Sequence, residues 1–314
     1  MDKARLDEGG VPDPPGRPPG HHQELARRDP PHLRQCPRRA PGPRCGGGRS
    51  DAPHRPLAEG EHVLTAPTRK AAAVIGGTHG LGHQLALRGS SAGLHTIVYG
   101  RSVNSIADSG GLDTRALDLT DPDSVRTANI AMPTPAYVFW VAGAHLKKAL
   151  VETDEAELTA LTRLLFTGPV SFLRRLLTAD HGPVHLVTIA SSSSWKRRER
   201  ETLYCALKAA QAAFTRNLVP ELLAAHPSSR VTLVNPGGLA VPDFHTGLDI
   251  DYGHMMDPGE VADIIWRLAR QQAGPFEEVQ ILRSAEPGRE GVPEVSFGPR
   301  PPQSPQPGEP AHRP

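Results

Sequence analysis

The sequence predicts a single doubly wound α/β domain with a parallel seven-stranded sheet, flanked by two disordered proline-rich tails. Three observations carry this prediction. Proline is concentrated at the two ends of the 314-residue chain, short apolar runs alternate with helical patterns between them, and glycines follow the first apolar run. Strands that alternate with helices form a parallel sheet, because each crossover returns the chain to the same end of the sheet. Helices must then cover both faces, so residues 69–285 form one domain.

The first part of this domain has the clearest pattern. The apolar run Ala71–Gly76 predicts a buried strand, and leucines at helical spacing from Leu81 predict a helix that stops at Gly93. His95–Tyr99 and Thr114–Asp118 are short segments bounded by turn residues. They predict the second and third strands.

The second part continues the alternation of strands and helices. A proline at the first helical position predicts a short helix over Asp121–Ile130. Apolar runs predict four more strands, and helical periodicity predicts three longer helices. The expected strands are Ala136–Ala142, Val184–Ala190, Arg230–Asn235 and Glu278–Leu282, and the expected helices are Asp154–Thr178, Thr202–Ala225 and Pro258–Gln271. The pair Gly168-Pro169 is expected to bend the first of these helices.

The two tails, residues 1–68 and 286–314, differ from the domain in composition. Residues 1–70 hold 13 of the 33 prolines and residues 286–314 hold 9. The first 70 residues contain only 8 Leu, Ile, Val, Met, Phe, Trp or Tyr, too few to offset the entropy of ordering a backbone. Both tails are therefore expected to be disordered. Residues 1–62 are expected to be dispensable for folding, and a weaker hypothesis is that the native chain starts near Val63.

Composition excludes several classes of function. Residues 71–285 carry 19 basic and 21 acidic side chains, which argues against a nucleic-acid partner. The longest apolar run is Ala136–Ala144, far shorter than the ~20 residues that span a bilayer. Three cysteines without metal-ligand spacing favour a reducing, cytoplasmic location and no metal. His145 is expected to be satisfied by backbone or water, with a position facing the substrate as the alternative. The charged run Lys196–Arg200 is expected to be a solvated loop, with binding of an acidic substrate as the alternative.

A glycine-rich turn joins the first strand to the first helix, with the sequence Gly76-Gly77-Thr78-His79-Gly80-Leu81-Gly82. Glycine at these positions lets the chain turn sharply and lets the backbone approach a pyrophosphate. The helix N-terminus then presents unpaired N–H groups to the phosphates. The turn predicts a dinucleotide site, with a glycine turn that binds nothing as the alternative.

The end of the second strand predicts which dinucleotide is preferred. An acidic residue at this place would accept a hydrogen bond from a ribose 2′-hydroxyl, but the sequence is Tyr99-Gly100-Arg101-Ser102. Arg101 can donate paired hydrogen bonds to a 2′-phosphate, and no carboxylate repels that phosphate. The segment therefore favours NADP(H) over NAD(H), unless Arg101 is merely a solvated loop residue.

Tyr204 and Lys208 lie four residues apart in the helix after the fifth strand. This spacing puts both side chains on one face, so the ammonium group can stabilise a phenolate and lower the pKa of the tyrosine. Ser191 follows the fifth strand, where the strand ends of an open α/β sheet face a ligand crevice. The three residues predict an acid–base site for a carbonyl or alcohol.

Together, the glycine turn, Ser191, the Y-x-x-x-K pair and Asn235-Pro236-Gly237 resemble the short-chain dehydrogenase/reductase family across residues 70–283. The resemblance implies a Rossmann-type fold with strand order 3-2-1-4-5-6-7 and hydride transfer at nicotinamide C4. It implies that Tyr204 exchanges the proton, Ser191 polarises the carbonyl and Lys208 holds the nicotinamide ribose. Further implied cofactor contacts are Asp118, Ala142, Gly143, Pro236 and Gly237. It also implies a homodimer or homotetramer formed through the helices that contain Leu158–Leu177 and Leu203–Leu223.

Four positions depart from the family pattern. Ile75 replaces a threonine, Val141 replaces the asparagine of the N-A-G element, and Val241 replaces a threonine that grips the carboxamide. Leu165 replaces the helix asparagine that anchors a proton-relay water, for which Thr162 is a candidate substitute. These departures leave a second hypothesis, a dinucleotide-binding sensor or scaffold with little turnover.

Overall fold

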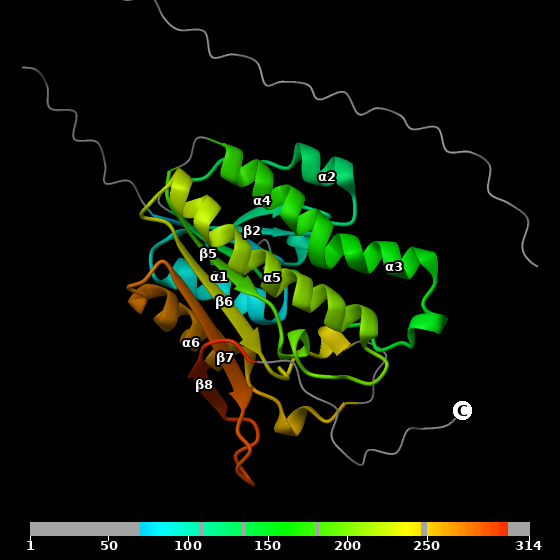
Figure 1. Ribbon diagram of the computed structural model, residues 1–314. Coiled ribbons are helices and arrows are strands. Elements are labelled where there is room, and N and C mark those ends of the chain that lie inside the picture. The colour runs from blue at the N-terminus through cyan, green and yellow to red at the C-terminus, as the bar shows by residue number, and fades with distance from the viewer. Residues whose placement is uncertain (1–69, 107–109, 134–135, 180–181, 246–249, 301–314) are drawn as a thin grey trace, which may run out of the picture. The chain divides into compact units, whose positions relative to one another are not determined.

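The computed structural model describes residues 70–106, 110–133, 136–179, 182–245 and 250–300 (Figure 1). These ranges include almost all of the predicted domain. The predicted tail 1–68 and the last residues, 301–314, lie outside them.

Within these described ranges, one sheet of eight strands has the order β3-β2-β1-β4-β5-β6-β7-β8. The first seven strands are parallel, so the predicted strand order is confirmed. The strands are β1 (Ala71–Ile75), β2 (His95–Gly100), β3 (Asp113–Ala116), β4 (Ala136–Trp140), β5 (Val184–Ile189), β6 (Arg230–Pro236), β7 (Phe276–Arg283) and β8 (Pro293–Phe297). The order reverses between β1 and β4, and such a switch point opens a ligand crevice at the carboxyl ends of the strands.

The eighth strand corrects the prediction in two respects. β8 pairs antiparallel with β7, from Val279 opposite Phe297 to Arg283 opposite Pro293. In the described residues the sheet therefore has eight strands instead of the predicted seven. Regular structure continues past residue 285, into the segment predicted to be a disordered tail. β8 begins at a proline, which an edge strand tolerates at its first position. Prolines and glycines on both sides give this segment the composition of a disordered tail, so the short strand was not predicted.

Helices cover both faces of the sheet (Figure 1). On one face, α1 (Gly80–Ser91) and α6 (Pro258–Gln271) pack their leucine, isoleucine and tryptophan side chains against alternate residues of the strands. On the other face lie α2 (Pro122–Thr127), α3 (Glu155–Thr162), α4 (Gly168–Thr178) and α5 (Thr202–Ala225). Val74 and Ile75 point into the two different cores, as the two-residue period of a strand requires.

The segment predicted as one bent helix over Asp154–Thr178 is broken by a π-helical turn, Arg163–Thr167, between α3 and α4. Asp154 begins α3 with a capping box to Glu157. Gly168 sits where an added Cβ would come within 2.1 Å of the Leu119 carbonyl oxygen. The predicted helix therefore passes through a π turn just before Gly168-Pro169, and such turns often mark functional sites.

Candidate active site

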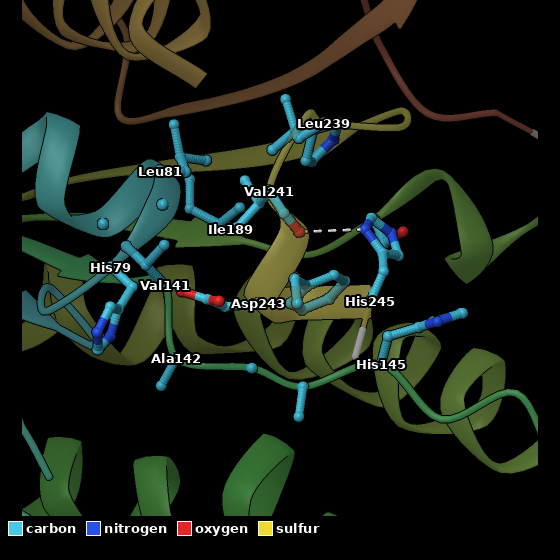
Figure 2. A pocket seen from close by; sticks show the side chains of 18 of the residues that line it. His79, Leu81, Val141, Ala142, His145, Ile189, Leu239, Val241, Asp243 and His245 are labelled. Carbon is cyan, nitrogen blue, oxygen red and sulfur yellow. Dashed lines mark hydrogen bonds between the residues drawn. The ribbon is translucent and has the colours of Figure 1, made fainter. Parts of the chain in front are cut away.

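A cavity of about 720 Å³ lies at the carboxyl ends of the strands, beside the switch point (Figure 2). Most of the predicted site residues line this cavity. They are Gly76, Thr78, His79, Gly80, Leu81, Gly82, Arg101, Ala142, Gly143, Ser191, Tyr204, Lys208, Pro236 and Gly237. Gly77 and Asp118 are the predicted residues that do not line it. The dinucleotide and acid–base residues, far apart in sequence, thus share one cavity.

The glycine turn approaches its neighbours more closely than any side chain permits. A Cβ on Gly76, whose φ is +87°, would lie 2.5 Å from the Ala142 Cα. A Cβ on Gly82 would lie 2.1 Å from the Gly76 carbonyl oxygen. Both contacts are with backbone, so neither can be relieved by a rotamer change. The glycines therefore set the tight strand-to-helix turn that a pyrophosphate site needs.

The N-terminus of α1 can receive an anion. His79 is the N-cap and makes no side-chain hydrogen bond to the helix, and no acidic residue occupies the first turn. The first N–H groups of a helix have no intrahelical partners, and the helix dipole favours a negative charge there. Gly77 lies beneath this end, packed between Val74 and Val98. The turn and the helix end together fit a bound pyrophosphate.

The second and third strands end beside the same cavity. Arg101 is exposed and lines it. The Asp118 carboxylate accepts hydrogen bonds from the Thr120 N–H at 2.8 Å and its hydroxyl at 2.6 Å. Burial opposes ionisation of this group, but these bonds hold the pKa of Asp118 below its usual value. The positive charge of the exposed Arg101 also lowers the pKa of Asp118, so Arg101 lies close enough to attract this carboxylate while it lines the cavity.

Backbone groups make hydrogen bonds next to two of the departures from the family pattern. The Ile75 carbonyl oxygen accepts from the Val141 N–H at 3.0 Å and from the Ala142 N–H at 2.8 Å. The Gly76 N–H donates to the Tyr99 carbonyl oxygen at 2.8 Å. These bonds tie the ends of β1, β2 and β4 together without a threonine or asparagine side chain.

Ser191 and Tyr204 both line the cavity, and their side chains interact. Ser191 follows β5, and its Oγ accepts a hydrogen bond from the Ser193 N–H at 3.1 Å. Tyr204, in the first turn of α5, is 4% exposed. The prediction that Lys208 lowers the pKa of Tyr204 is wrong for this structure, because burial raises that pKa and only a hydrogen bond with Ser191 and the charge of Arg198 partly oppose the rise. The phenol is thus held in its protonated form, beside the hydroxyl predicted to polarise a carbonyl.

Lys208 lies one turn further along α5, and its Nζ is 5.9 Å from the centre of the Tyr204 ring. The ammonium group donates to the Ile189 carbonyl oxygen at 3.3 Å and to the Gln211 Oε1 at 2.9 Å. Burial lowers the pKa of Lys208 to about 7. A bound phosphate or a phenolate would favour the charged form of this lysine.

Aromatic and histidine side chains form the wall near Tyr204. The His145 ring meets the Tyr204 ring edge-on, with centroids 4.9 Å apart, and stacks on Phe244 at 6.0 Å. His145 Nε2 lies 3.3 Å from Glu201 Oε1. His145 Nδ1 is buried and has no hydrogen-bond partner within the described part of the chain. His145 is therefore paired with the Glu201 side chain, a partner that the sequence did not predict, because Glu201 follows the charged loop into the cavity.

The charged run Lys196–Arg200 mostly conforms to its prediction as a solvated loop. Residues 197–200 are exposed. Arg198 nevertheless lines the cavity, and burial lowers the pKa of Lys196. Sequence analysis also missed Gln211, Phe244 and Glu201. The one available signal for Glu201 was its place three residues before Tyr204, which puts both on the same face of the start of α5.

Among the residues that the structure describes, no group of three or more His, Cys, Asp or Glu side chains could hold a metal ion. In the same ranges, no helix is long and apolar enough to cross a membrane.

Comparison with known proteins agrees with this geometry. The family model described as short chain dehydrogenase matches residues 70–248, and the chain belongs to this family. An uncharacterized oxidoreductase of Staphylococcus saprophyticus is 25% identical over 213 residues, which cover 62% of this chain and 88% of that protein. Dehydrogenase RED2 of Cochliobolus heterostrophus is 29% identical over 136 residues, which cover 41% of this chain and 51% of that protein. The chain is thus an oxidoreductase of the short-chain dehydrogenase type.

Solved structures show the same fold. A short-chain dehydrogenase/reductase from Vibrio parahaemolyticus superposes with a TM-score of 0.56 at 26% identity, covering 67% of this chain and 96% of that chain. The closed form of serine dehydrogenase complexed with NADP+ superposes with a TM-score of 0.54 at 19% identity, covering 66% and 93%. The second likeness establishes the fold alone.

Proposed function

We propose that this protein interconverts a carbonyl compound and a secondary alcohol with NADP(H), with Ser191, Tyr204 and Lys208 as its catalytic residues. The observation that carries the proposal is their convergence in one cavity with the glycine turn. A dinucleotide-binding protein without turnover is not favoured, because all three acid–base residues are present and the relatives with descriptive names are oxidoreductases or dehydrogenases.

The residues divide the work of a reduction as follows. NADPH, when bound, supplies the hydride that adds to the carbonyl carbon. Ser191 donates a hydrogen bond to the carbonyl oxygen, and Tyr204 transfers its phenolic proton to that oxygen as the new C–H bond forms. Lys208 stabilises the phenolate left on Tyr204. In the oxidation direction, the same phenolate accepts the hydroxyl proton of the alcohol.

The preference for NADP(H) rests on Arg101. Its guanidinium group lies at the cavity, and no carboxylate ends β2. Charge-assisted hydrogen bonds contribute about 1.5–3 kcal/mol, so Arg101→Ala is expected to weaken NADPH binding about tenfold or more. NADH, which lacks the 2′-phosphate, should bind unchanged. Fluorescence titration of both dinucleotides against both proteins measures this, and equal affinities of the unaltered protein for NADPH and NADH would remove the basis for the preference.

The reaction itself is tested with a panel of ketones, aldehydes and secondary alcohols, with NADPH or NADP+ absorbance as the readout. Turnover with at least one class supports the proposal. A folded protein that binds NADPH tightly and turns over no member of the panel would favour the sensor or scaffold.

The substrate class, the location and the oligomeric state complete the proposal. The substrate is a small carbonyl or alcohol compound, and an odd number of cysteines suits the cytoplasm. The homodimer or homotetramer remains a prediction. The leucines of α4 and α5 are at most partly exposed, and the exposed large apolar side chains within the described ranges are Leu150, Val151, Val292, Val295 and Phe297.

A further inference from the structure

Gln211 is completely buried, although glutamine is a polar residue. It lies on α5, three residues after Lys208, so the two side chains share one face of the helix. Its Oε1 accepts from the Lys208 Nζ at 2.9 Å, and its Nε2 donates to the Leu165 carbonyl oxygen at 2.6 Å. A buried amide costs free energy unless it is hydrogen-bonded. Both ends of this amide are paired, one of them to a proposed catalytic residue.

The position of Leu165 in the chain explains why its carbonyl oxygen accepts the hydrogen bond from Gln211. Leu165 belongs to the π turn Arg163–Thr167. In an α-helix its carbonyl would accept from the N–H of residue 169, which is Pro169 and has no N–H. The Leu165 carbonyl oxygen therefore cannot accept the bond that an α-helix would give it from residue 169, and it accepts from the Gln211 Nε2 on α5.

We propose that Gln211 is a positioning residue that holds Lys208 at the dinucleotide site by tying its ammonium group to the main chain of the π turn. The proposal rests on the role of Lys208 in the proposed function. It also accounts for Leu165, the most serious departure from the family pattern. A side-chain amide from α5 anchors the lysine at this place, so no asparagine at position 165 and no hydroxyl of Thr162 is needed for that purpose.

The alternative role of Gln211 is simple packing between α5 and the π turn. Two substitutions distinguish the positioning role from the packing role, because the two roles predict opposite orders for the severity of their effects. Gln211→Met keeps the volume but cannot bond to either partner, so a packing role predicts a mild effect. Gln211→Ala leaves a cavity lined by an ammonium group and a carbonyl oxygen, in which a water molecule can rebuild the bridge. A positioning role therefore predicts that Met is the more harmful of the two.

The lysine itself provides a readout that needs neither substrate nor turnover. The chain contains six lysines, so the Cε resonances of a ¹³C-lysine sample can be followed against pH, with Lys208→Arg to assign the signal. Tyr204 on the same helix is the titratable group facing Lys208, and burial is the cause that lowers the pKa of Lys208 to about 7. Removal of the Gln211 oxygen destabilises the ammonium form. Gln211→Met is expected to lower the pKa of Lys208 by about one unit, and Gln211→Ala by less.

NADPH affinity is measured on the same samples, with the thermal melt as the control for folding. We expect Gln211→Met to weaken NADPH about tenfold and Gln211→Ala about threefold. If Gln211→Met does not fold, Gln211→Glu serves in its place, since a carboxylate beside Lys208 should raise the pKa of that lysine. An unchanged lysine titration in Gln211→Met, or a larger loss in Gln211→Ala than in Gln211→Met, would overturn the positioning role. If the unaltered protein does not bind NADPH, that result would instead refute the proposed function.

Discussion

Gly82 offers the sharpest test of the glycine turn as the pyrophosphate site. In Gly82→Ala the new Cβ would lie 2.1 Å from the Gly76 carbonyl oxygen and 3.0 Å from the Gly77 Cα. Real Cβ atoms do not approach other atoms closer than about 3.0 Å, so α1 and the turn must separate by about 1 Å. Overpacking of this kind costs about 1–3 kcal/mol, and the better helix propensity of alanine returns only about 1 kcal/mol.

The displacement matters more for binding than for folding, because the N–H groups of this turn must meet the phosphates at hydrogen-bond distance. A misplacement of ~1 Å can cost about a hundredfold, so we expect the NADPH Kd to rise at least tenfold. Isothermal titration measures the affinity. Gly274→Ala is the matched control, since a Cβ there meets nothing within 4 Å. Unchanged NADPH affinity in folded Gly82→Ala would refute the close-approach argument.

Three further predictions address the chemistry, the pH dependence and the assembly. Tyr204→Phe should lower kcat about a hundred- to ten-thousandfold and leave the NADPH Kd within twofold, and substantial remaining turnover would reject Tyr204 as proton donor. Burial lowers the pKa of His185 from 6.5 to about 4. As the pH falls from 6.5 to 4, the imidazole is protonated in the unfolded chain before it is protonated in the folded one, so the free energy of unfolding decreases over this pH range. The loss is about 3 kcal/mol, and urea melts of His185→Phe should lack that part of the slope. Light scattering at micromolar concentration should return a dimer or tetramer, and a monomer would contradict the prediction.

The sequence predicted the strands and most helix boundaries because these depend on local periodicity, whereas the strand order was predicted only through the resemblance to the family. The helix Thr202–Ala225 and the helix Pro258–Gln271 appear with the expected bounds. β8 was not predicted because its pairing with β7 is a tertiary contact that no local pattern encodes. An edge strand of five residues also has little effect on the composition of a proline-rich segment.

The cavity was predictable where a motif carries the chemistry and unpredictable where only the fold brings residues together. The glycine turn and the Y-x-x-x-K pair have fixed spacings that follow from the geometry of a turn and a helix. Gln211 reaches Leu165 across 46 positions of sequence, and His145 meets Glu201 from a different loop. Neither pair has a spacing that sequence reasoning could recognise.

Transfer of deuterium from the dinucleotide to a product tests the central claim most directly. The protein is incubated with a carbonyl panel and NADPH that carries deuterium at both C4 positions, and the alcohols formed are analysed by mass spectrometry. The account predicts alcohol that carries deuterium at the former carbonyl carbon with the unaltered protein, and almost none with Tyr204→Phe. Folded protein that binds this NADPH and yields no deuterated alcohol, or equal yields from the two proteins, would contradict the account.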